Sequence, residues 1–197
     1  VDAEGANLPT FLPGDHIDLH LPNGLTRQYS ITNGPGETAY YRIGVKRDPA
    51  STGGSAYLHD RAKPGDVLEI SAPRNRFTLR RNVPSTILIA GGIGITPILA
   101  MAQALDRAGL KVAVHSFVSS EGVVAFRDVL DRLGPVVHRY VGLDPDATAG
   151  AIEQLLATPD PSVQVAACGP PLMLDVIQTI ASAAGWDEDA VSFEYFQ

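Results

Sequence analysis

Apolar residues follow two different patterns along the chain, one before and one after about residue 82. In the first part, short β-like runs are separated by Gly, Pro and Asn turns, which is typical of a small antiparallel barrel. The strands expected there are His16 to Leu21, Gln28 to Thr32, Tyr40 to Lys46 and Val67 to Ser71. We place the boundary in the polar segment from Arg80 to Ser85.

The second part alternates extended apolar runs with segments of helical periodicity. The expected strands are Thr86 to Ala90, Lys111 to Val118, Val136 to Tyr140, Val163 to Ala167 and Val191 to Phe193. The expected helices are Thr96 to Ala108, Val124 to Leu133, Ala149 to Leu156 and Pro171 to Ala184. This alternation predicts a parallel sheet that binds ligands at the carboxyl ends of its strands. We therefore expect an antiparallel β-barrel over residues 1–82 and an α/β domain over residues 83–197.

Composition narrows the possible partners. Fifteen basic and twenty-two acidic residues give a net charge of −7, which argues against a nucleic-acid partner. The sequence has neither an apolar run of about twenty residues nor a signal-peptide pattern, so we expect no membrane partner and a cytoplasmic location. A single cysteine excludes an internal disulfide and a four-thiolate iron–sulfur cluster built by this chain alone. From the sequence at its two ends, we expect the chain to be a piece of a longer protein.

The first candidate site is the strand segment from Arg27 to Ser30. On an extended strand, Arg27 and Tyr29 point to one face and Ser30 to the other. A ligand on the first face could take a charge from Arg27 and a ring contact from Tyr29. Taken alone, the segment also fits an ordinary barrel strand with a solvated Arg and a half-buried Tyr.

Thr52-Gly53-Gly54-Ser55 is a second candidate, because it precedes the apolar residues Ala56-Tyr57-Leu58. A Gly-Gly-Ser turn that leads into a helix presents unpaired N–H groups to an anion, and a nearby Arg27 would add a charged hydrogen bond. The segment is therefore a candidate phosphate cradle. A flexible surface loop is the other interpretation.

The third candidate is the turn from Ala90 to Pro97, which lies between a predicted strand and a predicted helix. Glycines there would let the backbone approach the pyrophosphate of a dinucleotide. The spacing Gly-Gly-x-Gly-x-Thr-Pro is neither a Walker loop nor the usual Rossmann fingerprint. A tight strand-to-helix turn in any α/β domain would also fit.

Cys168-Gly169-Pro170-Pro171 follows the apolar strand Val163 to Ala167, so Cys168 is expected at the carboxyl end of a strand, where a substrate would lie. A lone cysteine is more often a small buried hydrophobe. No metal-ligand or Ser-His-Asp pattern is present, and the scattered histidines read as structural or surface residues: His16, His20, His59, His115 and His138.

Together, these segments resemble the phthalate dioxygenase reductase type of flavin reductase in the ferredoxin-NADP reductase superfamily. The likeness covers nearly the whole chain and depends on the order and spacing of the motifs. The matching segments are Arg27-Gln28-Tyr29-Ser30, Val45-Lys46-Arg47-Asp48, Gly53-Gly54-Ser55, Pro73-Arg74-Asn75-Arg76-Phe77, Gly91 to Pro97, Cys168-Gly169-Pro170 and Phe193-Glu194-Tyr195-Phe196.

The resemblance implies a role for each matching site residue. On the flavin side these are Arg27 at the phosphate, Gly53, Gly54 and Ser55 completing its cradle, Tyr29 and Ser30 at the isoalloxazine ring, and Val45 and Lys46 as further cofactor contacts. On the nucleotide side they are Gly91, Gly92, Gly94 and Thr96 along the NADH path, and Cys168, Gly169 and Pro170 at the nicotinamide. Phe196 and Glu194 are expected beside the flavin. The residues implied at the point of hydride transfer are Cys168, Ser30 and Thr96.

This likeness implies that NADH passes a hydride to FMN, and that single electrons then go to an iron–sulfur domain or protein that feeds a terminal oxygenase. We expect FMN rather than FAD as the flavin. Ser119-Ser120-Glu121 stands where many relatives have an arginine, so we expect NADH over NADPH, with Arg127 the nearest cation along the chain. Two other functions stay open. One is a stand-alone NADH:flavin reductase of the diaphorase type, and the other is a non-catalytic flavin-binding docking module.

Overall fold

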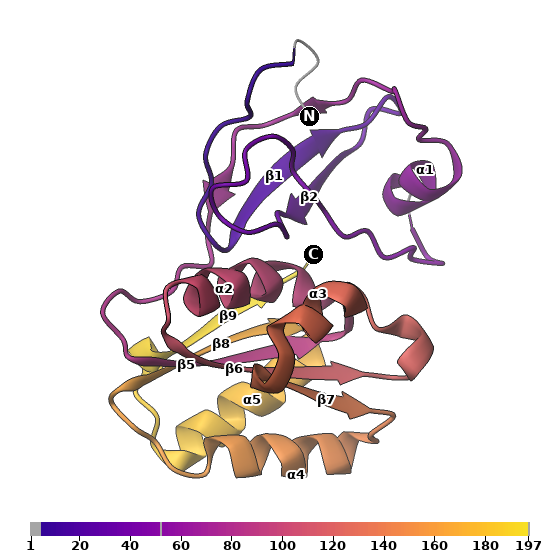
Figure 1. Cartoon of the computed structure of the whole chain (residues 1–197). Helices are drawn as coiled ribbons and strands as arrows, with labels where there is room; N and C mark the ends of the chain where they lie inside the picture. The colour runs from indigo at the N-terminus through magenta and orange to yellow at the C-terminus, as the bar shows by residue number, and fades with distance from the viewer. Residues whose placement is uncertain (1–4, 52, 197) are drawn as a thin grey trace.

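Two sheets, one antiparallel and one parallel, divide the molecule into an N-terminal half and a C-terminal half (Figure 1). The structure is a computed structural model that describes residues 5–51 and 53–196. Over these residues, no helix combines the length and the apolar composition that a membrane span requires.

The N-terminal sheet consists of β1 (Asp15–His20), β2 (Thr26–Ser30), β3 (Glu69–Ile70) and β4 (Arg74–Asn75), all antiparallel to β1. A seven-residue helix, α1 (Gly54–Asp60), lies beside it. The expectation of antiparallel structure is confirmed. The strand expected over Tyr40 to Lys46 is wrong, because this segment forms an isolated bridge between Ile43 and Ile31 rather than a described strand.

The C-terminal half holds a parallel sheet in the order β7-β6-β5-β8-β9. Its strands are β5 (Ser85–Gly91), β6 (Lys111–Val118), β7 (Val137–Val141), β8 (Val163–Gly169) and β9 (Val191–Tyr195). Its helices are α2 (Ile95–Arg107), α3 (Arg127–Leu133), α4 (Pro145–Leu156) and α5 (Pro171–Ala184), with short 3-10 turns η1 (Gly92–Gly94), η2 (Glu121–Val123), η3 (Gly134–Val136) and η4 (Glu188–Ala190). The expected fold class of this half, a parallel sheet with helices, is confirmed.

Helices cover both faces of this sheet. One core cluster joins β5 and β6 to α2 and α3, and the other joins β8 to α4 and α5. Burial on both faces explains why the central strands are continuously apolar. Figure 1 shows α2 and α3 on the face toward the N-terminal half and α4 and α5 on the opposite face.

Two helix starts differ from the sequence pattern. α4 begins four residues before the expected Ala149, because Asp144 caps the helix by accepting from the Ala147 N–H at 2.8 Å and Pro145 fills its first position. α3 begins three residues later than expected. The reason is Phe126, whose φ of 55° interrupts helical geometry just before Arg127.

α2 is the helix that joins the two halves. Near its C-terminal end, the Gln103 side-chain amide donates to the Thr32 carbonyl at 2.9 Å, and Arg107 pairs with Glu37 at 2.6 Å. Near its start, Thr96 faces Gly44. The helix therefore contacts the N-terminal half near both of its ends. The Thr96 end lies at the carboxyl edge of the parallel sheet, where the strands end.

Candidate functional site

The carboxyl edge of the parallel sheet brings together motifs that are far apart in the sequence. In the strand register, Cys168 of β8 lies between Ala90 of β5 and Glu194 of β9. The Gly91 turn, Cys168 and Glu194 therefore occupy neighbouring strands. Figure 1 draws the C-terminal end of the chain at the boundary between the two halves.

Cys168 is an inert thiol in this setting. Its exposed fraction is 1%, and it is part of the core cluster around α2. Burial, and then the nearby Glu194 carboxylate, raise the pKa of the Cys168 thiol far above its usual value. Because nucleophilic attack requires the thiolate, Cys168 is suited to contact a ligand and not to attack one.

Glu194 carries an unusual carboxyl group. Its Oε2 atom is buried and has no hydrogen-bond partner among the residues that the structure describes. Burial raises the pKa of Glu194 to about 7, so the group changes charge near neutral pH. A buried oxygen without a partner costs free energy unless a ligand donor or water reaches it. An amide N–H of a bound cofactor would meet this need.

The glycines of the first turn have different structural roles. A methyl group on Gly94 would lie 2.2 Å from the Cys168 carbonyl oxygen, and one on Gly91 would lie 2.6 Å from the Pro170 ring. A methyl group on Gly169 would in turn lie 3.0 Å from the Gly91 Cα. Gly92 differs, because its φ is +55° and no described atom lies within 4 Å of the added carbon. Only Gly92 therefore leaves room for a ligand beside it.

Thr96 lies at the boundary between the halves. Its hydroxyl donates to the Ile93 carbonyl at 3.0 Å, and its exposed fraction is 2%. Its methyl group faces Gly44, where an added Cβ would be 2.6 Å away. The ring of Phe126 reaches the same point, at 2.9 Å. No sequence signal points to Gly44 or Phe126, because neither belongs to a recognisable motif.

On the N-terminal side, β2 holds Arg27 and Tyr29 partly buried and Ser30 fully buried. An alanine methyl at Gly54 would lie 2.8 Å from Arg27 Cγ and Nε, so the guanidinium stem lies directly on the start of α1. This contact brings together the two motifs that the sequence assigned to one phosphate. Since α1 has only seven residues, the positive charge there comes chiefly from Arg27.

The loop over residues 45–51 is fastened to α1 by three polar contacts. His59 Nε2 donates to the Val45 carbonyl at 2.9 Å, and the Asp48 N–H donates to Ser55 Oγ at 3.2 Å. The third contact is the ion pair between Arg47 and Asp60, at 2.8 Å. The Ser55 hydroxyl, expected at a phosphate, therefore already holds the loop. Thr52 lies outside the described residues.

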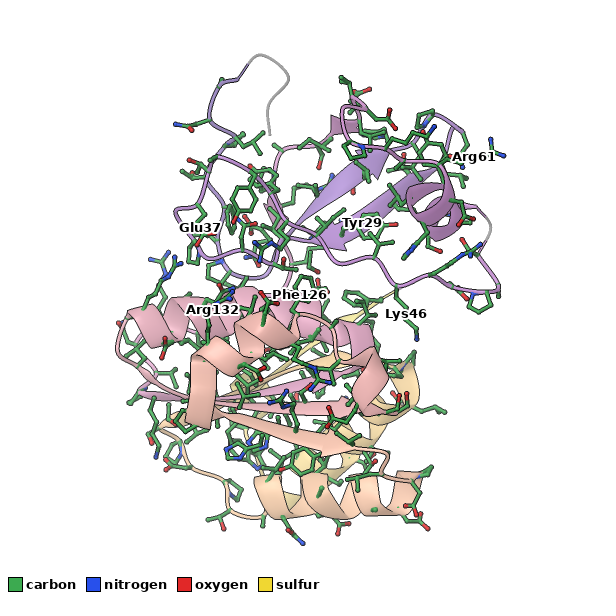
Figure 2. The ribbon with its side chains drawn as sticks, turned by 45° about the vertical axis from the view of Figure 1, so that its right-hand side comes forward. Tyr29, Glu37, Lys46, Arg61, Phe126 and Arg132 are labelled. Carbon is green, nitrogen blue, oxygen red and sulfur yellow. The ribbon has the colours of Figure 1, made fainter. Side chains whose placement is uncertain are left out.

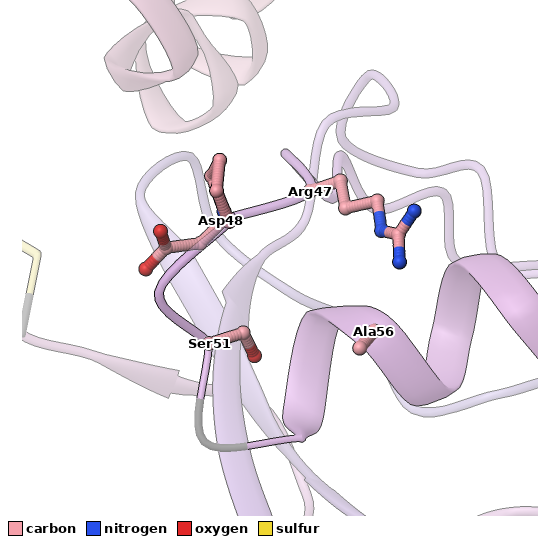
Figure 3. Close-up of a pocket in the computed structure, with 5 residues that line it drawn as sticks. Arg47, Asp48, Ser51 and Ala56 are labelled. Carbon is pink, nitrogen blue, oxygen red and sulfur yellow. The ribbon is translucent and has the colours of Figure 1, made fainter.

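An open hollow of about 360 Å³ lies between this loop and the helix. Figure 3 shows Arg47, Asp48 and Ser51 on the loop, with Ala56 on the helix across from them. The hollow does not include Arg27, Cys168 or Glu194. It is therefore separate from the residues expected to carry the chemistry.

The remaining predicted residues are more exposed. Lys46 is exposed on the N-terminal side of the boundary between the halves (Figure 2), and 41% of Phe196 is exposed. On the loop after β6, Arg127 donates to Glu121 at 2.7 Å, with 46% and 62% of their side chains exposed. The nearest cation along the chain is therefore already paired with the acidic residue.

The chain is similar in sequence to curated oxidoreductases over nearly its whole length. No family model matches the chain. Among curated proteins, it is 42% identical over 193 residues to the oxidoreductase NdmD of Pseudomonas putida, covering 98% of this chain and 33% of that protein. It is 37% identical to the vanillate O-demethylase oxidoreductase of Acinetobacter baylyi, covering 100% of this chain and 62% of that one. The chain thus spans about a third of the length of the first relative and about three fifths of the length of the second.

Solved structures agree with the sequence comparison. Phthalate dioxygenase reductase, described as a modular structure for electron transfer from pyridine nucleotides to [2Fe-2S], superposes with a TM-score of 0.92 at 35% identity, over 98% of this chain and 61% of that one. A type IV self-sufficient cytochrome P450 monooxygenase superposes with a TM-score of 0.90 at 33% identity, over 100% of this chain and 25% of that one.

Proposed function

We propose that the chain is the NADH-dependent FMN oxidoreductase part of an oxygenase system, of the phthalate dioxygenase reductase type in the ferredoxin-NADP reductase superfamily. In this proposal, residues 1–82 hold the flavin and residues 83–197 hold the nicotinamide nucleotide. When bound, the two cofactors supply the hydride and electron chemistry, and the protein supplies position and electrostatics.

The observation that carries the proposal is the pair Cys168 and Glu194 at the carboxyl edge. A buried, protonated thiol lies beside a buried carboxyl oxygen that has no partner among the described residues. In the proposed complex, Glu194 accepts a hydrogen bond from the bound cofactors, and Cys168 packs against the nicotinamide and keeps water away. A carboxyl group whose pKa is about 7 can accept this bond without a full negative charge at neutral pH.

On the flavin side, Arg27 binds the phosphate together with the amides at Gly54 and Ser55. Gly53 forms the turn before them, and its N–H donates to Ser51 Oγ at 3.1 Å. The close contact of Arg27 with Gly54 supports this role, because a larger residue at 54 would displace the arginine. Tyr29, Val45 and Lys46 contact the ring, Ser30 at the end of β2 reaches it from the strand edge, and Phe196 covers it from the C-terminal side. Gly92 and the backbone around it leave room for the nucleotide, while Gly91, Gly94, Thr96, Gly169 and Pro170 shape the edge that it follows.

Two measurements test this proposal directly. Addition of NADH to the flavin-loaded protein without oxygen should bleach its yellow colour within seconds. A yellow protein that NADH does not bleach would instead be a binding module without activity. Mass analysis of the cofactor released by denaturation should give FMN, and FAD would overturn that part of the proposal.

The electron acceptor is proposed to be an iron–sulfur domain or protein that serves a terminal oxygenase. The chain supplies one cysteine, so it cannot ligate a four-thiolate cluster by itself. Phthalate dioxygenase reductase, described as transferring electrons from pyridine nucleotides to [2Fe-2S], supports this partner class. We expect the flavin-loaded protein to reduce such an iron–sulfur partner with NADH. A protein that reduces free flavin or dyes but no iron–sulfur protein would be the stand-alone reductase instead.

The proposed nucleotide is NADH. Glu121 follows the end of β6, the position from which the 2′-phosphate of NADPH would be approached, and its ion pair occupies Arg127. Glu121 would repel the 2′-phosphate, and Arg127 is already neutralised by Glu121. Catalytic efficiency should be higher with NADH than with NADPH, and the reverse order would contradict the assignment.

A further inference from the structure

Three segments from distant parts of the chain meet at Gly44. An alanine methyl at this position would lie 2.6 Å from Thr96 Cγ2, 2.9 Å from Phe126 Cε2 and 3.0 Å from Phe126 Cζ. The backbone angle of Gly44 is not in the left-handed region, so a glycine is needed there because of what faces it. The loop that leads to Val45 and Lys46 therefore touches the C-terminal half without a side chain of its own in between.

Phe126 is held at this point by an uncommon backbone conformation. Among the described residues, it and Asn82 are the two non-glycine residues with a positive φ, and asparagine tolerates that conformation far better than phenylalanine. The Phe126 carbonyl accepts from the N–H groups of Val129 and Leu130, both at 3.0 Å, and these two side chains are buried in the core. Figure 2 shows Phe126 at the boundary between the halves. Such strained residues persist where the surrounding structure enforces them, often at functional sites.

The two ends of α2 join the halves in different ways. Near its C-terminal end, Gln103 and Arg107 make polar contacts with residues 32–37. Near its start, the contact is the close approach of Gly44 to Thr96 and Phe126. This second end directly follows Gly94, which packs on the Cys168 carbonyl. The contact between the halves at the end of α2 nearest to Cys168 is therefore the one at Gly44.

We propose that Phe126, acting through Gly44 and Thr96, is a positioning residue that sets the distance between the flavin-holding half and the nicotinamide-holding edge. This inference rests on the proposed function. Transfer between two bound rings requires the reacting atoms within about 3–3.5 Å of each other, and a displacement of about 1 Å can cost a hundredfold in rate. A change at this contact should slow the transfer and leave the binding of each cofactor nearly intact.

The first test uses Gly44→Ala, with rapid mixing of NADH and the flavin-loaded protein. The limiting rate of flavin reduction should fall at least tenfold, while the flavin content and the dissociation constant of NADH stay within twofold of the parent protein. Gly150→Ala is the matched control, because its added methyl group meets no described atom within 4 Å. Adding Phe126→Ala to Gly44→Ala removes one of the two obstructions and should recover part of the lost rate.

The second test needs no cofactor. Cys168 is the single cysteine of the chain and is 1% exposed, so its reaction with a thiol reagent reports whether the edge beside it has opened. In the flavin-free protein, Gly44→Ala should raise the reaction rate several-fold, and Gly150→Ala should not change it. If Gly44→Ala does not fold, Phe126→Leu replaces it in both tests, with about a threefold effect expected.

The outcomes separate this inference from the proposed function. If NADH bleaches both the parent protein and Gly44→Ala at the same limiting rate, the positioning role is wrong and the proposed function stands. A rate that falls only in step with NADH affinity also overturns the role, and so does an unchanged thiol reaction rate. If NADH does not bleach the parent protein, the proposed function fails, and the thiol test still decides whether Gly44 sets the separation.

Discussion

The two halves of the molecule build their parts of the site in different ways. In the N-terminal half, the buried core cluster consists of Phe11, Ile17 and Ile31, and polar contacts between exposed residues fasten the candidate flavin loop. In the C-terminal half, two large core clusters support the sheet, and the glycines of the edge pack on backbone atoms. The carboxyl edge of the parallel sheet is therefore preformed by packing, whereas the loop over residues 45–51, the candidate flavin loop, depends on contacts for which water competes.

The two kinds of contact differ in the free energy that they contribute to folding. An exposed ion pair such as Arg47–Asp60 stabilises a protein by less than about 1 kcal/mol. Crowding a methyl group into a packed core costs about 1–3 kcal/mol or more. Single changes at the edge should therefore affect folding, and single changes around the flavin loop should chiefly affect ligand binding.

The largest effect is expected for Gly94→Ala. Its methyl group would lie 2.2 Å from the Cys168 carbonyl oxygen, a backbone atom that cannot move without disturbing β8, so we expect a loss of about 3 kcal/mol in unfolding free energy. Gly92→Ala is the matched control. Its methyl group enters open space and costs only about 1–2 kcal/mol of backbone strain.

Denaturant unfolding followed by the fluorescence of Trp186 compares these two variants. Trp186 is the single tryptophan, it is buried in the C-terminal half, and its indole N–H donates to the Leu156 carbonyl at 2.8 Å. Equal losses for Gly94→Ala and Gly92→Ala would contradict the view that packing shapes the edge.

Glu194→Gln should give a pH-dependent gain of stability. Burial raises the pKa of this carboxyl group from 4.5 to about 7, so the folded protein binds the proton more tightly than the unfolded chain. The stability that protonated Glu194 contributes is present below pH 4.5 and is lost as the pH rises through 7. Above pH 7, the glutamine variant without cofactor should be more stable than the parent by up to about 3 kcal/mol. Denaturant unfolding of both proteins at pH 5 and pH 8 measures the difference in stability. A gain of equal size at both pH values would show that the raised pKa of Glu194 is not its cause.

Arg27→Ala should act on the ligand instead of the fold. Loss of a charged hydrogen bond worth about 1.5–3 kcal/mol should weaken FMN binding by roughly tenfold to a hundredfold, with little change in the stability of the flavin-free protein. Arg61→Ala is the control, because Arg61 follows the other end of α1 and carries the same charge (Figure 2). Fluorescence titration with FMN gives both affinities. Equal losses would mean that overall charge, and not the contact at Gly54, holds the phosphate.

The smallest effect is expected for Glu121→Gln. It removes the negative charge that lies 2.7 Å from Arg127 and keeps the hydrogen bond from Arg127 to the carbonyl of residue 121 at 2.6 Å, so the charge of Arg127 is no longer neutralised beside the NADPH 2′-phosphate. Catalytic efficiency with NADPH should rise by up to about fivefold, which corresponds to the roughly 1 kcal/mol of an exposed charged contact. Adding Arg127→Ala should abolish the gain. A gain that persists without Arg127 would point to relief of repulsion alone.

The elements of the C-terminal half were predicted well from the sequence, because each strand and helix carries a long apolar pattern within its own segment. The strand expected at Tyr40 to Lys46 failed because this segment makes contacts outside the sheet, with Gly44 against α2 and Phe126. Such contacts leave no local pattern. The site motifs were visible as segments, but the pairing of Glu121 with Arg127 and the buried oxygen of Glu194 follow from tertiary packing.

The packing of Gly91 and Gly94 bears on how such chains are compared across lineages. Since both residues are required by the neighbouring strand and proline, a descendant that had stopped using a nicotinamide coenzyme would still retain them in order to fold. Gly92 is free of that packing demand and is held only by its positive φ, which disfavours other residues by about 1–2 kcal/mol, so it would change before Gly91 or Gly94. Substitution at residue 92 is therefore a better marker of lost activity in distant homologues than the glycine motif as a whole.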